Sequence, residues 1–223
     1  MPTILIACRA LAGELELASR EAGVAHPTRW IEAAVHVRPD ALRRRLQDEL
    51  DGIAGAERVI LGFGYCGHSL LGLRAGAFEL VFPRADDCIS LMLGSAERRE
   101  AVASEAPTYF LTEGWLDNGV SIWDDYRRTV DAMGPRRAGE AFATMLAHYS
   151  RLGVIDTGAC PLARLVERTQ GIAETLGLEH RVIPGSTRFL QRLLAGPWED
   201  EFVTVPPGGA VTLDHLLGLD RPS

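Results

Sequence analysis

Three cysteines stand just after short apolar runs of the sequence, where parallel strands would end. Cys8, Cys66 and Cys88 each come within about one helical turn of such a run. Because the carboxyl ends of parallel strands meet at one edge of a sheet, we expect the three thiols to converge there. Three protein ligands with an open fourth position are typical of a catalytic zinc site, and three thiolates also suit an iron–sulfur cluster. No C-x-x-C spacing is present, but the convergence of three thiols favours a zinc-dependent enzyme, with the iron–sulfur cluster as an alternative. Each cysteine taken alone is more typical of a small core residue.

Charged and polar residues accompany the cysteines at the same strand ends. His68, Asp86 and Asp87 are predicted to act as acid–base groups or to orient the metal ligands. Two arginines are predicted to hold an anionic part of a small-molecule substrate, and glycines and a tryptophan to complete the binding site; these residues are Arg9, Arg84, Gly64, Gly67 and Trp115. Transfer of a methyl or other small group and hydrolysis both fit such a site. Solvated surface charge is the alternative interpretation for each charged residue.

A glycine motif, Gly62-x-Gly64-x-x-Gly67, directly follows the second of these apolar runs. In dinucleotide-binding proteins this pattern opens a long helix whose N-terminus receives a pyrophosphate. Here only about two helical turns fit before Gly76, so we do not expect a dinucleotide. A phosphate or another small anion remains an alternative ligand for this turn. A fourth cysteine, Cys160, precedes Pro161 at a predicted helix start, where the helix dipole is expected to lower the pKa of its thiol.

Short apolar runs alternate with helical patterns along the whole chain, which predicts an α/β fold. We expect a Rossmann-like three-layer sandwich with a mostly parallel sheet, formed as a single domain over residues 1–223. A second strand is expected within residues 30–37 and a short helix between Gly67 and Gly76. Residues 117–150 form a helical excursion, interrupted at Gly134-Pro135. The tail from about residue 216 is expected to fray.

Composition narrows the classes of partner. The chain has 223 residues, a hydrophobic share of 47%, a charged share of 24% and a formal net charge of -7. This negative balance argues against nucleic acid and anionic membrane surfaces as partners. No apolar run approaches the roughly 20 residues that cross a bilayer, and the N-terminal run lacks a preceding basic region. We therefore expect a cytoplasmic protein with reduced thiols.

Several ordered motifs resemble the domain-of-unknown-function family 1638. They are the segments 62–68, 83–95, 108–115 and 155–158, followed by Gly196-Pro-Trp and Val205-Pro-Pro-Gly. The resemblance runs from about Ile4 to Gly208. It implies an association with corrinoid-dependent methyltransferase systems and one-carbon metabolism, with a corrinoid protein or a methyltransferase as a candidate partner. A non-catalytic ligand-binding or accessory protein of such a system is therefore an alternative to the enzyme.

Overall fold

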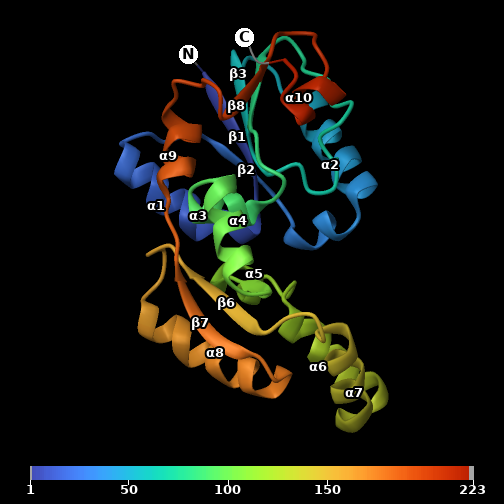
Figure 1. The fold of residues 1–223 in the computed structure, drawn as a ribbon. Helices are drawn as coiled ribbons and strands as arrows, with labels where there is room; N and C mark the ends of the chain where they lie inside the picture. The colour runs from blue at the N-terminus through green and yellow to red at the C-terminus, as the bar shows by residue number, and fades with distance from the viewer. Residues whose placement is uncertain (1, 221–223) are drawn as a thin grey trace.

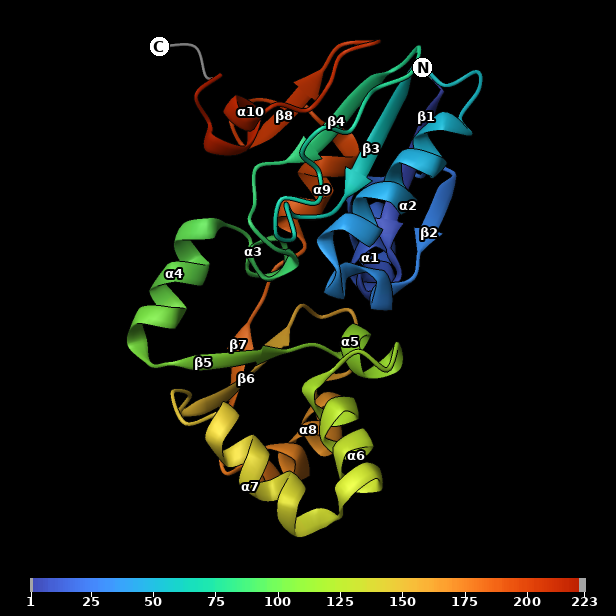
Figure 2. The same cartoon turned by 90° about the vertical axis from the view of Figure 1, so that its right-hand side faces the viewer.

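The computed structural model describes residues 2–220, whose strands form two sheets (Figures 1 and 2). The first sheet has five strands in the order β2 (Thr28–Ile31), β1 (Thr3–Cys8), β3 (Arg58–Gly62), β4 (Glu79–Pro83) and β8 (Phe202–Val205). Its pairs are parallel except that β8 runs antiparallel to β4. The second sheet is parallel, with the order β5 (Thr108–Leu111), β6 (Arg151–Asp156) and β7 (Glu179–Pro184).

Helices cover both faces of the five-stranded sheet because successive side chains of each strand point to opposite faces. Leu5 of β1 belongs to the core shared with α1 (Ala12–Ala22) and α9 (Arg188–Ala195). The next residue, Ile6, belongs to the core on the other face, against α2 (Pro39–Asp51). The predicted α/β sandwich with a mostly parallel sheet is confirmed.

The three-stranded sheet has its own helices. Its core residues pack with α8 (Leu162–Leu176), α6 (Ile122–Met133) and α7 (Pro135–Met145). The predicted helical excursion is confirmed here, and its interruption lies at Gly134, which ends α6 with a φ of 83°.

The two sheets meet through the segments that follow their strands, so their carboxyl edges face each other (Figure 2). Gly114, in α5 (Glu113–Asp117) after β5, lies directly against the carbonyl oxygen of Ala10, in the 3-10 turn η1 (Arg9–Leu11) after β1. Ser186, after β7, donates its main-chain N–H to the Met92 carbonyl of α3 (Cys88–Leu93) over 2.7 Å. Helix α4 (Ala96–Glu105) then leads the chain from one sheet to the other.

One core cluster joins the two halves of the molecule. Leu5 and Leu15 from the first half share it with Phe110, Ile155 and Ile183 from the second. The joint between the sheets is therefore packed with apolar side chains.

Two local predictions are wrong. The second strand is Thr28–Ile31, and residues 33–37, expected to extend it, form the 3-10 helix η2 (Ala33–Val37). No helix forms among the described residues between Gly67 and Gly76, because three successive residues from Cys66 to His68 have positive φ and turn the chain sharply.

The tail for which we expect fraying lies partly in α10 (Leu213–Leu217), while residues 221–223 lie outside the described part of the chain. Within the described residues, no helix has the length and apolar character needed to span a membrane.

Candidate functional site

The loop that carries the glycine motif is held against the segment after β4. Tyr65 donates its main-chain N–H to the Ala85 carbonyl over 2.7 Å, and Cys66 donates to the Asp86 carbonyl over 2.9 Å. A Cβ on Gly64 would lie 2.6 Å from the backbone of Asp87. Glycine is thus required at position 64 for the two segments to approach, which is a structural need independent of any ligand.

The three predicted thiol residues lie at this edge of the five-stranded sheet and interact electrostatically. Burial, with smaller contributions from the nearby Cys8 and Asp87, raises the pKa of Cys66 to about 12. Burial also raises the pKa of Cys88 well above its ordinary value, with contributions from Cys66 and Cys8. The pKa of Cys8 is raised by the same desolvation. All three thiols are therefore protonated at neutral pH.

The prediction of a metal-dependent enzyme at these cysteines, with zinc or with an iron–sulfur cluster, is wrong. Among residues 2–220, no three His, Cys, Asp or Glu side chains form a group that could hold a metal ion.

Of the three predicted acid–base residues, one caps a helix and the other two are exposed. Asp87 caps α3 by accepting the Ser90 N–H over 3.2 Å, and its other oxygen pairs with Arg99 at 2.9 Å. Asp86 is exposed and lines a cavity beside Arg84. His68 is exposed, with a φ of 67°.

Three other predicted binding residues lie away from that cavity. The guanidinium of Arg9 stacks over the Trp30 ring at 5.4 Å. Trp115 packs against the core clusters of both sheets. Gly67 has a φ of 68° and faces the ring of Pro39, at 3.1 Å from where a Cβ would lie.

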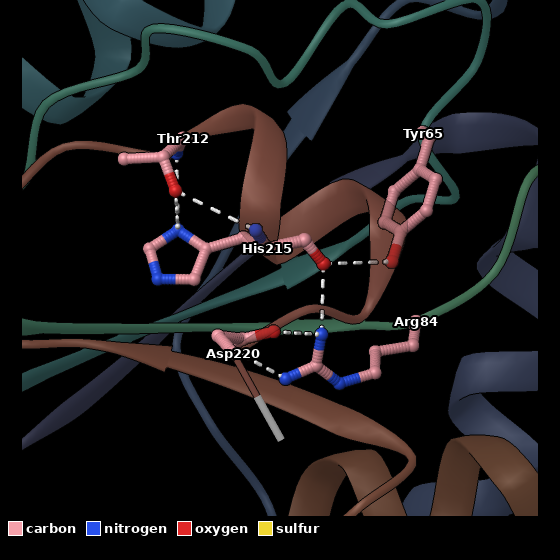
Figure 3. A network of polar contacts seen from close by, with 5 residues as sticks. All are labelled: Tyr65, Arg84, Thr212, His215 and Asp220. Carbon is pink, nitrogen blue, oxygen red and sulfur yellow. Dashed lines mark hydrogen bonds and ion pairs between the residues drawn. The ribbon is translucent and has the colours of Figure 1, made fainter. Parts of the chain in front are cut away.

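Arg84 lies at the centre of a network of polar contacts at this edge of the sheet (Figure 3). Its side chain is only 9% exposed. Nη1 donates to Asp220 Oδ1 over 2.8 Å and Nη2 to Asp220 Oδ2 over 2.7 Å, while Nη1 also donates to the His215 carbonyl over 2.8 Å. The Tyr65 hydroxyl donates to the same carbonyl over 3.5 Å. The buried Nε has no acceptor among the described residues.

A cavity of about 250 Å³ lies beside this network. It is lined by Tyr65, Arg84 and Asp86 from the sheet edge and by Leu216, Leu217 and Gly218 from the C-terminal segment. Sequence reasoning identified Arg84 and Asp86 but missed Tyr65 and the C-terminal segment. Tyr65 lies inside the glycine motif, so its position pointed to a role at this site. Asp220 comes 136 residues after Arg84, and no sequence pattern connects the two residues.

A second polar group lies where the sheets meet. Glu14 is 6% exposed and accepts a hydrogen bond from Thr157 over 3.2 Å. Burial raises its pKa, and the nearby Glu113 adds to the effect. The prediction of a lowered pKa for Cys160 is wrong: burial and, after it, the hydrogen bond to Glu113 together raise the pKa of this thiol to about 12.

Comparison with protein families matches residues 30–194 to the model described as "Protein of unknown function (DUF1638)". The comparisons with curated proteins and with solved structures gave no significant match. The association with corrinoid methyltransferase systems stays a prediction.

Proposed function

This chain belongs to the DUF1638 family of proteins of unknown function, and we propose that it binds a small anionic molecule at Arg84. The observation that carries this proposal is an arginine whose side chain is 9% exposed and borders a cavity at the carboxyl edge of the five-stranded sheet. In open α/β sheets, ligands bind outside the carboxyl ends of the strands. The family description itself gives no function, so the proposal rests on these residues.

The chemistry of Arg84 favours an oxyanion. A guanidinium presents its N–H donors in a planar fork that matches a carboxylate or a phosphate. A buried donor that lacks an acceptor costs about 1–3 kcal/mol, and Nε of Arg84 is such a donor among the described residues. An anion that accepts from Nε and from one terminal nitrogen would remove that cost.

The volume of the cavity limits the size of the ligand, and the protonation of the thiols indicates binding without a covalent bond. At about 250 Å³, the cavity is smaller than the roughly 300–1,000 Å³ of sites for drug-sized ligands, so it suits a compact anion. Thiols with raised pKa are poor nucleophiles because the thiolate is the reactive form. Binding is therefore a better description of this edge than covalent capture by Cys66 or Cys88.

Thermal unfolding with added anions tests the proposal. Inorganic phosphate and malonate are titrated separately, at constant ionic strength, into the wild type and Arg84→Gln. A ligand of the native state raises the unfolding midpoint saturably, and we expect this rise in the wild type and its loss in Arg84→Gln. Arg127, an exposed arginine of α6, gives the control Arg127→Gln, which should keep the rise.

Equal responses of the wild type and Arg84→Gln would contradict the proposal. Circular dichroism checks that Arg84→Gln is folded. If it is not, Arg84→Lys replaces it, because lysine keeps the charge and loses the planar fork. That variant should bind both anions at least several-fold more weakly.

A further inference from the structure

The C-terminal strap, residues 212–220, already supplies a carboxylate to the proposed anion site. Asp220 meets Arg84 with both oxygens, one on each terminal nitrogen, as Figure 3 shows. This is the bidentate arrangement in which arginine binds a carboxylate ligand. Arg84 also holds the strap's main chain through the His215 carbonyl.

The strap is joined to the rest of the molecule at one firm point. Val211, just before it, is 2% exposed and exchanges main-chain hydrogen bonds with the loop after β3: its N–H donates to the Leu73 carbonyl and its carbonyl accepts from Gly72. These bonds fix the strap's first end next to the sheet. Release of the strap would leave them intact.

Beyond Val211 the strap depends on few contacts. None of the residues of α10 is fully buried, although Leu216 packs against the core beside α2. Leu213, Leu217 and Leu219 are 49%, 59% and 70% exposed. The helix is capped internally, since Thr212 and His215 exchange hydrogen bonds. The bonds of Arg84 to Asp220 and to the His215 carbonyl are therefore the main polar attachments of the strap.

We infer that the strap is an intramolecular competitor for the anion site, in which Asp220 stands in for the carboxylate of a ligand. The inference rests on the proposed function and adds two points to it: the ligand carries a carboxylate, and the ligand must displace Asp220. While Asp220 is bound, only the fraction of molecules with an open strap is competent to bind. The apparent dissociation constant is raised in inverse proportion to that fraction.

Removing the Asp220 charge in the full chain tests this inference. Asp220→Asn keeps the shape of the side chain and loses the second acceptor oxygen. Calorimetric titration with malonate, at fixed pH and ionic strength, should show at least tenfold tighter binding to Asp220→Asn than to the wild type. Asp214→Asn changes another carboxylate of the same strap, in the first turn of α10, and should bind as the wild type does. Arg84→Gln/Asp220→Asn should not bind.

The outcomes separate the inference from the proposed function. Equal affinity of the wild type and Asp220→Asn, with binding lost in Arg84→Gln, overturns the strap and leaves the anion site. Absence of binding in every variant overturns both. A parallel titration of Asp220→Asn with inorganic phosphate identifies the anion: tighter binding of malonate than of phosphate supports a carboxylate ligand, and the reverse overturns that assignment.

A second measurement does not depend on the stability of the variant. Hydrogen exchange of the wild type reports the main-chain amides of residues 213–220 directly. Saturating malonate should speed exchange in this segment and leave the amides of Leu73 and Val211 protected. Unchanged exchange under conditions where malonate is bound would overturn displacement of the strap.

Discussion

Cys66 places a thiol where ionisation is strongly opposed, which makes its reactivity predictable. Its pKa of about 12, against an ordinary 9.0, lowers the thiolate fraction at neutral pH about 1,000-fold. We expect iodoacetamide at pH 7.5 to alkylate Cys66 far more slowly in the native chain than in urea. Peptide mass spectrometry measures both rates, and comparable rates would contradict the assigned burial.

Glu14, buried where the two sheets meet, makes the stability of the protein depend on pH. Its folded-state pKa is raised by burial above the ordinary 4.5. The associated stability is fully present below the unfolded-state pKa and is lost as the pH rises through the folded-state pKa. Glu14→Gln removes this dependence, because glutamine stays neutral and still accepts a hydrogen bond from Thr157. Urea unfolding at pH 4.5 and pH 8 should therefore show a larger gain from Glu14→Gln at pH 8. A pH-independent difference would contradict the prediction.

At the scale of elements, the contact between the glycine loop and the start of α3 depends on one missing side chain. Gly64→Ala would force a Cβ to 2.6 Å from the Asp87 backbone. We expect destabilisation of about 1–3 kcal/mol in urea unfolding. The matched control is Gly139→Ala in α7, where a Cβ would meet nothing within 4 Å. That change should be neutral or stabilise by up to about 1 kcal/mol. Equal effects of the two changes would contradict the packing role of Gly64.

The sequence was informative about elements wherever a pattern was local. The β1 and β3 strands show as apolar runs, and the Gly134 break in the helical excursion shows as a Gly-Pro pair. The turn from Cys66 to His68 was missed because two non-glycine residues take positive φ there, against their own preference. The Arg84–Asp220 pair was missed because it joins residues 136 positions apart, and no spacing rule reaches across that distance.

At the scale of the molecule, the joint between the sheets depends on Gly114. A Cβ at this position would lie 1.9 Å from the Ala10 carbonyl oxygen, so the two carboxyl edges would have to separate. Gly114→Ala should destabilise the protein by about 3 kcal/mol or more. Gly171→Ala in α8, where a Cβ meets nothing within 4 Å, should not. Because the sheets share a core, the loss should be a shift of one cooperative transition, with circular dichroism and fluorescence midpoints coinciding in the wild type. Separate midpoints would show that the halves unfold independently.

Strands β4 and β8 are neighbours in space, yet the entire three-stranded sheet lies between them in the chain. The ribosome therefore makes residues 108–184, which contain the whole three-stranded sheet, before it makes β8, which completes the five-stranded sheet. The nascent chain must carry β4 with an open edge while the second sheet assembles. Asp220 emerges later still, so Arg84 has no Asp220 carboxylate to pair with while both sheets are being made.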